Sequence, residues 1–289
     1  MASPLNVALG RYRHGFVVIS VITAAVLLLL PFVVLIATST SANAFALFPP
    51  QGFTLDWYKK VLTDPAWASS LWLSVWVSAL ATLIATVFGV AGALALPRIR
   101  NKAAVRALRT LFIVPIALPP VAYAVGLYGV NLSVPFLHGT FASLIIGDSL
   151  LALPYVFVVV SGAVGRLDTA LRPAASTMGA SWPMIVFRVE LPLLVGGIVA
   201  GALFAFSTVF DEVVLAVFVA PLGSSTLPLK MLTESQEAVS PELTAASTLL
   251  SLLALVILGA VNLVMRRRAA QAAKASQPVL PQAAKVVNA

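Results

Sequence analysis

The chain has 289 residues, of which 60% are hydrophobic and only 10% are charged. A soluble domain carries about 25% charged residues, so the composition excludes an ordinary soluble protein and indicates an integral membrane protein. Cysteine is absent, which excludes disulfides, thiolate metal sites and cysteine nucleophiles. The net charge is +8. In a membrane protein the positions of the basic residues along the chain indicate its orientation, so this charge gives no reason to expect a nucleic-acid partner.

Six apolar stretches are long enough to cross a bilayer, which takes about 20 residues. They are residues 16–37, 70–96, 110–131, 141–164, 191–219 and 243–265. We therefore expect an all-α bundle of six transmembrane helices over residues 16–268. The first stretch follows two arginines and precedes "ANA", as in a signal peptide. Its apolar core of about 20 residues exceeds the usual ~7–15 of such a peptide, which favours a retained span.

Basic residues are distributed very unevenly between the two sides of this six-span arrangement. Fifteen of the 18 lysines and arginines fall in the amino-terminal tail, the loops 97–109 and 165–190, and the carboxyl-terminal tail. The remaining three are Lys59, Lys60 and Lys230. By the positive-inside rule both termini and both basic loops are expected to be cytoplasmic.

The segments outside the spans have distinct compositions. Residues 1–15 are predicted to be a cytoplasmic tail, and residues 269–289, rich in Ala, Gln and Pro, a disordered one. The external segment 38–69 contains Trp57, Tyr58 and Trp67 among polar residues. Aromatic side chains of this kind suit the lipid headgroup region, so a short surface helix is expected before the second span.

The loop 165–190 is unusually structured for a connection between spans. Apolar residues recur at helical spacing from Leu167 to Met178, after a possible helix N-cap at Asp168. Gly179 can end this helix, and a second short helix is expected over 182–189. Pro192 suits the first turn of the following span. The pattern is compatible with a docking element for a soluble partner and equally with a linker helix on the membrane surface.

A motif with long spacing supports the docking alternative. Its residues here are Pro173, Ala174, Ala175, Gly179, Val189, Leu191 and Pro192. The stretch resembles the cytoplasmic loop of inner-membrane permease subunits of binding-protein-dependent ABC importers, where the motif reads E-A-A, three residues, G, nine residues, I, one residue, L-P. The spacing is complete. Proline replaces the glutamate at 173, which removes a carboxylate that could pair with a basic residue of the partner.

The resemblance, which residues 71–96 and 111–130 also carry, implies an ABC importer type I permease with a MetI-like fold. In that family the loop forms a coupling helix that sits in a cleft of a separate ATP-hydrolysing subunit. The ATPase-coupling residues implied are Leu171, Pro173, Ala174, Ala175, Met178, Gly179, Leu191 and Pro192. Implied partners are a dimer of ATP-binding subunits, a second homologous permease, an external solute-binding protein and membrane lipid.

No catalytic, cofactor or metal site is expected in the chain itself. The glycines do not form G-x-x-x-x-G-K-[ST], so a phosphate-binding loop is not predicted. His14 and His138 are far apart and near span ends, which favours interfacial side chains over ligands or bases. ATP hydrolysis is therefore expected on another chain, and this chain is not expected to be an enzyme.

Three acidic residues fall within the spans, where a charge is costly, by about 2.5–3.5 kcal/mol. They are Asp148 in the fourth span and the adjacent Asp211 and Glu212 in the fifth. At 1.5 Å per residue from Leu191, Asp211 lies roughly 30 Å along its helix, in the outer half of the membrane. These carboxylates could attract a cation, act as a gate, or form a structural pair with a neighbouring helix. The loop 219–231 is a possible re-entrant element at the outer mouth.

The fifth span and the residues after it narrow the resemblance. The segments "FSTVFDEVVLAVFVAPLGSSTLPLKM" and "AVSPELTAASTLLSLLALV" resemble the second permease of spermidine/putrescine importers. The same subfamily includes permeases for 2-aminoethylphosphonate and related solutes. The resemblance therefore implies a polyamine as cargo, with another small organic solute as the alternative.

Two other classes of function remain open from the sequence. A stand-alone channel or secondary carrier would transport without ATP and would need no partner at loop 165–190. A structural membrane scaffold would show no dependence on a solute. Copurification with a soluble ATPase separates the importer subunit from both.

Overall fold

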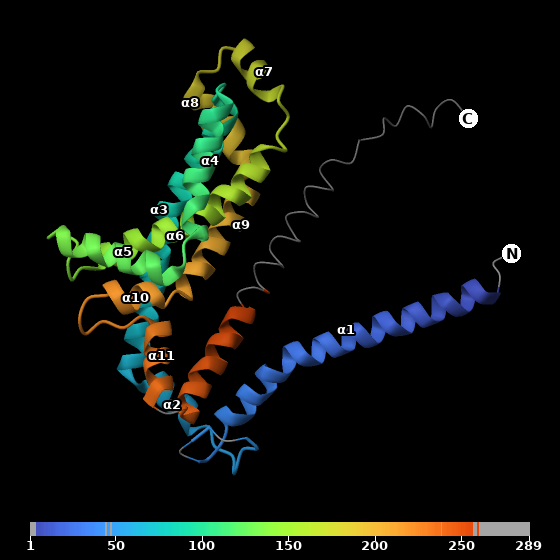
Figure 1. Cartoon of the computed structure of the whole chain (residues 1–289), viewed down its shortest axis with the longest axis vertical. Coiled ribbons are helices and arrows are strands. Elements are labelled where there is room, and N and C mark those ends of the chain that lie inside the picture. Colours follow the sequence, from blue (N-terminus) through green and yellow to red (C-terminus); the bar gives the residue numbers. More distant parts are fainter. Residues whose placement is uncertain (1–3, 44, 47, 238, 257–258, 260–289) are drawn as a thin grey trace, which may run out of the picture. The chain divides into compact units, whose positions relative to one another are not determined.

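The computed structural model describes residues 4–43, 45–46, 48–237, 239–256 and 259. Regular structure in these residues is entirely helical (Figure 1). The chain divides into two compact units, one formed by residues 63–237 and the other by residues of the two ends, 1–62 and 238–289.

The central unit is built on three long helices that pack along one another. They are α3 (Pro65–Ala95), α6 (Phe141–Val164) and α9 (Leu191–Phe210). Asp64 begins α3 by accepting a hydrogen bond from the backbone N–H of Ala66 at 2.8 Å, and a 3-10 turn, η1 (Leu96–Arg98), continues it. The bounds of α6 are those predicted for the fourth span. Figure 1 shows this bundle with further helices grouped at its two ends.

Glycines allow the three long helices to approach closely, as is common in membrane bundles. A Cβ at Gly89 of α3 would lie 2.9 Å from the Cβ of Val156 and 3.2 Å from the backbone nitrogen of Phe157 on α6. A Cβ at Gly201 of α9 would lie 3.2 Å from the Cα of Val156. Val156 and Phe157 are buried in the largest apolar cluster, so α6 packs tightly against both neighbours at this level.

We expect Gly89→Ala to be less stable than Gly162→Ala, because only the first methyl group enters an occupied space. Both glycines lie inside helices, so both substitutions gain about 1 kcal/mol of helix propensity. Gly162 has no atom within 4 Å of its would-be Cβ, whereas Gly89 faces Val156. Overpacking costs about 1–3 kcal/mol. Thermal unfolding in detergent, followed by tryptophan fluorescence, measures the difference, and equal midpoints would contradict the tight packing of α3 on α6.

The predicted third span is not one continuous helix. It is broken into α4 (Lys102–Ala117) and α5 (Pro120–Ser133), which meet at 103°. The break falls at Leu118 and Pro119, directly before Pro120. A proline disfavours the helical conformation in the residue before it and cannot donate a backbone hydrogen bond, so two consecutive prolines separate the segments. In Figure 1, α5 runs across the bundle and α4 runs along it.

The predicted fifth span is also interrupted. α9 ends at Phe210, and α10 (Val214–Val219) begins after a break at Asp211–Val213. After a turn at Gly223 with a φ of +79°, the chain forms α11 (Leu227–Glu237). The prediction of one helix over 191–219 was wrong. The mean hydropathy of this segment stays high, although two adjacent carboxylates, Asp211 and Glu212, stand where the helix is interrupted.

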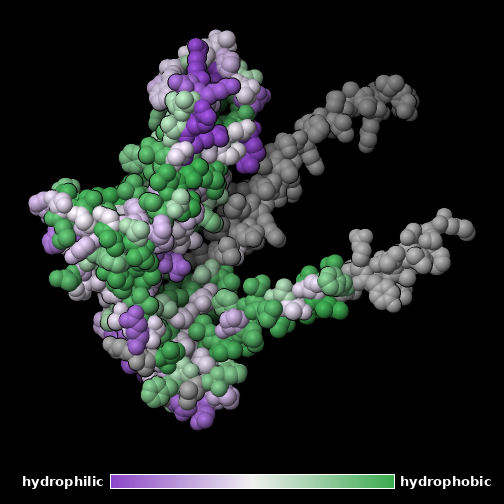
Figure 2. All heavy atoms as spheres, viewed as in Figure 1, coloured by the Kyte–Doolittle hydropathy of each residue, from purple (hydrophilic) through white to green (hydrophobic). Residues whose placement is uncertain are grey.

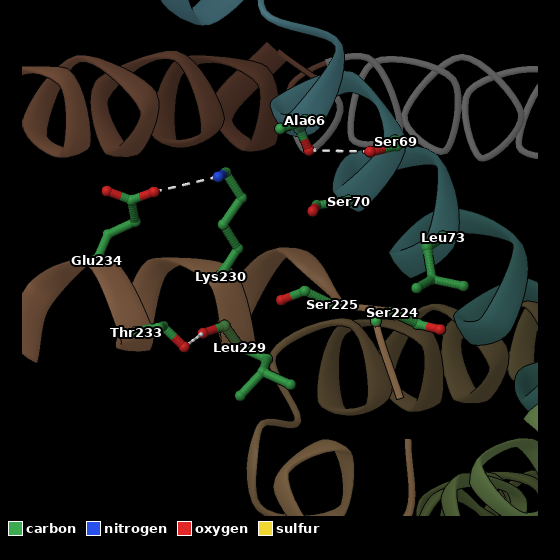
Figure 3. Close-up of a pocket in the computed structure, with 11 residues that line it drawn as sticks. Ala66, Ser69, Ser70, Leu73, Ser224, Ser225, Leu229, Lys230, Thr233 and Glu234 are labelled. Atoms are coloured by element: carbon green, nitrogen blue, oxygen red, sulfur yellow. Dashed lines mark hydrogen bonds and ion pairs between the residues drawn. The ribbon is translucent and has the colours of Figure 1, made fainter. Parts of the chain in front are cut away.

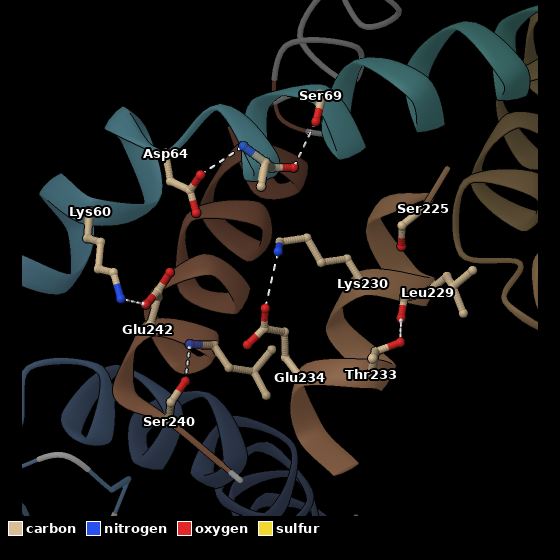
Figure 4. Close-up of polar contacts among 12 residues, drawn as sticks. Lys60, Asp64, Ser69, Ser225, Leu229, Lys230, Thr233, Glu234, Ser240 and Glu242 are labelled. Carbon is tan, nitrogen blue, oxygen red and sulfur yellow. Dashed lines mark hydrogen bonds and ion pairs between the residues drawn. The ribbon is translucent and has the colours of Figure 1, made fainter. Parts of the chain in front are cut away.

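The unit of the chain ends contains α1 (Pro4–Ser39), α2 (Asp56–Thr63) and a helix over Pro241–Val256. The α2 helix is the short helix expected before the second span. Its Trp57 indole donates to the carbonyl of Ser41 at 2.9 Å, and Lys60 forms an ion pair with Glu242 at 2.5 Å (Figure 4). The predicted sixth span ends beyond the described residues, and the tail 269–289 lies outside them.

Several helices are long and apolar enough to cross a membrane. Four qualify within the described residues: Phe16–Ser39, Pro65–Arg98, Phe141–Val164 and Trp182–Phe210. The bent pair of α4 and α5 raises the number to five if it forms one span. The protein is therefore a multi-pass membrane protein, and the predicted sixth span is described only over the shorter apolar helix Pro241–Val256.

Candidate functional site

The loop 165–190 contains the predicted first helix and the glycine turn that follows it. α7 (Leu171–Thr177) ends at Gly179, whose φ of +78° is the left-handed conformation that glycine adopts readily. The N–H of Ala180 donates to the carbonyl of Ala175 at 3.1 Å, and that of Gly179 to Ser176 at 3.0 Å. These two bonds form a Schellman motif, which satisfies the last carbonyls of the helix.

The start of α7 differs slightly from the prediction. The Asp168 carboxylate accepts from the backbone N–H of Ala170 at 2.9 Å. The regular helix begins only at Leu171 and its N-cap position is Ala170. Asp168 therefore stabilises the turn that precedes the helix and does not cap the helix itself.

The second short helix continues into the next span without a break. α8 (Trp182–Ile185) passes into a π-helical turn, η2 (Val186–Glu190), and this turn leads into α9 with Pro192 in its first turn. Trp182–Phe210 is one apolar helix of 29 residues. α8 and α9 therefore form one continuous helical segment, and π-helical turns of this kind are frequent at functional sites.

The apolar residues of α7 divide between two faces, whereas the sequence predicted one. Ala175 is 5% exposed and Leu171 half-buried, so this pair, four residues apart, faces the protein. Ala174 is exposed and Met178 is 82% exposed, so the second pair faces away. Of the residues assigned to ATPase coupling, Pro173, Gly179 and Pro192 are also exposed, and Leu191 is half-buried.

Large apolar side chains are exposed at this end of the central unit. Met178, Trp182 and Phe187 are 82%, 62% and 68% exposed. Figure 2 shows that hydrophilic residues gather at the end that carries α7 and α8, beyond a hydrophobic belt. Exposed apolar residues within a polar surface are typical of a protein interaction site. We call Met178, Trp182 and Phe187 the apolar tip.

A buried carboxylate holds the base of the same loop. Glu190 is 1% exposed. Its Oε2 accepts from Nη2 of Arg98 at 2.8 Å, and its Oε1 accepts from Nε of Arg172. The Arg98 guanidinium also lies 5.5 Å from the ring centroid of Trp182. No role for Glu190 was predicted from the sequence. The one feature that could have indicated an ion pair is its position as a carboxylate beside Leu191, in a segment that contains several arginines.

Asp148 is buried in the central unit at membrane depth. It is 3% exposed, and its Oδ1 has no hydrogen-bond partner among the described residues. The Tyr123 hydroxyl of α5 donates to the neighbouring carbonyl of Gly147 at 2.9 Å. The turn of α6 that carries Asp148 packs against α10, the helix that follows Glu212, since a Cβ at Gly147 would lie 2.7 Å from Cδ2 of Leu215. Two of the three acidic residues proposed as substrate or gate candidates therefore lie on neighbouring segments.

Asp211 and Glu212 have different surroundings although they are adjacent. Oε1 of Glu212 accepts from the backbone N–H groups of Val214 and Leu215 at 2.6 and 3.0 Å. Glu212 therefore holds the first turn of α10, a local role different from the pairing with a neighbouring helix that the sequence suggested. Asp211 is exposed at the end of α9. Within a membrane, a broken helix that carries an exposed carboxylate is tolerated where it faces a partner helix or a water-filled cavity.

A pocket of about 720 Å³ lies at the other end of the central unit (Figure 3). Hydroxyl groups from α3, from the turn before α11 and from α11 line it. They belong to Ser69, Ser70, Ser224, Ser225 and Thr233. Lys230 forms an ion pair with Glu234 at 3.1 Å (Figure 4) and lies 4.7 Å from the ring centroid of Trp67. Leu73 and Leu229 add apolar surface to the pocket, and its two charged side chains compensate each other.

Acidic and histidine side chains in the described part of the chain form no group of three or more that could hold a metal ion.

The family match and the similar known proteins agree that this chain resembles transport permeases. Residues 81–271 match the family of binding-protein-dependent transport system inner membrane components. The spermidine/putrescine transport system permease protein PotC of Haemophilus influenzae is 29% identical over 83% of this chain and 92% of its own. PotC of Escherichia coli is 30% identical over 83% and 89%. The molybdenum transport system permease protein ModB of Mycobacterium bovis is 31% identical over 71% and 83%.

Solved structures show the same fold at lower sequence identity. A bacterial ABC transporter involved in the import of the acidic polysaccharide alginate has a chain that matches with a TM-score of 0.66 at 15% identity, over 90% of this chain and 97% of that one. The alginate transporter in complex with its pentasaccharide-bound periplasmic protein matches with a TM-score of 0.70 at 16% identity, over 91% and 96%. With the family match over residues 81–271, this chain belongs to the family of binding-protein-dependent transport system inner membrane components, as a permease subunit of an ABC importer.

Proposed function

We propose that α7, α8 and the apolar tip dock on a separate ATP-hydrolysing subunit. The observation that carries this proposal is the exposure of Met178, Trp182 and Phe187 at the end of the unit where the E-A-A-type motif lies. ATP binding closes the partner's cleft and displaces the docked segment. Because α8 continues through η2 into α9, the displacement tilts that span. Hydrolysis occurs on the partner, and this chain is a non-catalytic transport subunit.

The chain supplies half of a translocation pathway and pairs with a second homologous permease. An external solute-binding protein delivers the cargo, and both termini lie in the cytoplasm of a bacterial cell. The split of fifteen basic residues against three supports this orientation. The exposed carboxylate of Asp211 and the buried Asp148 are the groups that meet the cargo or gate its passage.

The cargo proposed first is a polyamine. The support is the similarity to spermidine/putrescine permeases over most of both chains and the acidic residues at membrane depth. The second candidate is a zwitterionic solute such as 2-aminoethylphosphonate. The hydroxyl-lined pocket with its Lys230–Glu234 pair favours it, because a phosphonate would meet a lysine and an ammonium group a carboxylate.

Reconstitution tests both parts of the proposal. The tagged chain is purified with its ATPase subunit, second permease and binding protein, and placed in liposomes. We expect uptake of labelled putrescine that requires ATP and stops with a non-hydrolysable analogue. Excess unlabelled spermidine should compete with this uptake if the cargo is a polyamine. If the cargo is the zwitterion, labelled 2-aminoethylphosphonate is taken up in the same ATP-dependent way and putrescine is not. ATP-independent uptake, or purification with no ATPase, would contradict the docking proposal.

A further inference from the structure

We infer that Glu190, Arg98 and Arg172, here called the Glu190 cluster, make α7 move as one body with the adjoining ends of α3 and α9. Glu190 is thus a positioning residue for transport. It transmits the displacement of the docked segment to a second span, α3. The chain itself connects α7 and α8 directly to α9 but not to α3. The inference rests on the docking proposed above and adds a second path by which the displacement reaches the membrane spans.

The cluster joins three elements that are distant in sequence. Glu190 stands at the last position of η2, Arg172 lies in α7, and Arg98 ends η1 after α3. The carboxylate is bonded to both guanidinium groups, one on each oxygen. Arg98 also contacts Trp182, the first residue of α8. A single side chain therefore connects α7, α9 and the end of α3.

The chain connections on either side of α7 are not helical. Residues 165–170 form a turn before it, and residues 179–181 form the glycine turn after it. Through these two joints and the small apolar contact at Ala175, part of a push on α7 would be absorbed by changes in the backbone angles. The Glu190 cluster adds an ionic attachment at Arg172, on the first turn of the helix.

Burial makes this attachment resistant to breaking. The side chain of Glu190 is 2% exposed, and those of Arg98 and Arg172 are 25% and 30% exposed. Separating one arginine would leave the buried carboxylate with one cationic partner, which is unfavourable, and separating both would leave it uncompensated, which is strongly unfavourable. α7 contains no acidic residue of its own, since proline stands at 173. The carboxylate that meets Arg172 is supplied instead from the start of α9.

The first test compares transport with hydrolysis in the complete reconstituted importer. We expect Glu190→Gln to keep its ATPase subunit, because the apolar tip is unchanged, and to lower the number of solute molecules imported per ATP by about tenfold. Arg188→Gln is the matched control. It removes one charge from the same π-helical turn, its side chain is exposed, and it has no ion pair among the described residues. The control should import as the wild type does.

A second variant keeps the test valid if Glu190→Gln does not fold. Arg172→Gln leaves the Arg98–Glu190 pair intact and changes a partly exposed side chain. We expect it to fold, to bind the ATPase, and to show a similar loss of imported solute per ATP. Arg172→Lys restores the charge and should recover most of the transport.

Two results would overturn the inference and leave the docking proposal standing. One is an Arg172→Gln importer that assembles and moves as much solute per ATP as the wild type. The other is an Arg172→Gln chain that loses the ATPase, since Arg172 would then contact the partner and not link the helices. Failure of the wild-type chain itself to bind any ATPase would instead contradict the proposed function.

Discussion

Replacing Met178 with aspartate will weaken the association of this chain with its ATPase subunit by about tenfold or more. Met178 is 82% exposed at the end of α7, and full burial of a methionine side chain contributes about 1.5–3 kcal/mol. Each 1.4 kcal/mol corresponds to about tenfold in affinity. An aspartate loses that contribution and adds a charge that must be desolvated. Titration of the purified ATPase subunit against the detergent-solubilised permease measures the change.

Two controls separate docking from general effects of the substitution. Met178→Leu keeps an apolar side chain of similar size and should bind as the wild type does. Leu222→Asp places the same charge on a fully exposed apolar residue in the turn between α10 and α11, at the opposite end of the central unit (Figure 1). It should leave ATPase binding unchanged. Equal affinity of Met178→Asp and wild type would exclude Met178 from the interface.

Ala175 does not serve as a probe of docking, although the motif includes it. Its side chain is 5% exposed on the inner face of α7. A large or charged residue there would disturb the packing of the helix on the protein, so a loss of binding would report misfolding. The exposed face of α7, with Ala174 and Met178, is where substitutions report on a partner.

Asp211→Asn will reduce uptake of a polyamine by about tenfold, while leaving assembly of the importer intact. The amide has the shape of the carboxylate without its charge, and hydrogen bonds to charged groups contribute about 1.5–3 kcal/mol. Asp211 is exposed at the broken end of α9, so its charge is available to a cation. The initial rate of ATP-dependent putrescine uptake in liposomes is the measurement.

Glu212→Gln is the matched control for Asp211→Asn. It removes the neighbouring charge but keeps an oxygen that can accept from the backbone N–H groups of Val214 and Leu215. Uptake should fall less than in Asp211→Asn. If the two substitutions have equal effects, or if Asp211→Asn has none, the exposed carboxylate is not the group that meets the cation.

Hydropathy predicted those parts of the fold that depend on length and composition alone. The fourth span has the predicted bounds because its apolar run is long and ends in a glycine and a basic residue. The third and fifth spans are interrupted at Pro119 and at Asp211. The residues at both breaks are evident in the sequence. The mean hydropathy over a window of about 20 residues does not show where a helix changes direction.

The part of the candidate site that depends on neighbouring residues in the sequence, the end of α7, could be predicted. Gly179 ends α7 because a left-handed residue is needed there, and that requirement is encoded within a few positions. The division of α7 into two faces depends on what packs beneath it. The contact between Arg98 and Glu190 joins residues 92 positions apart. A single sequence contains many arginines that could meet that carboxylate, and only the packing of α3 against α9 selects one.

The most direct test of the account is the accessibility of a single cysteine on α7. The chain contains no cysteine, so Ser176→Cys, at an exposed position, introduces one thiol. A membrane-impermeant maleimide should label it in inside-out vesicles and not in intact cells, and bound ATPase should protect it. Labelling from the outside of the cell, or labelling that the ATPase does not slow, would contradict a cytoplasmic docking element at residues 165–190.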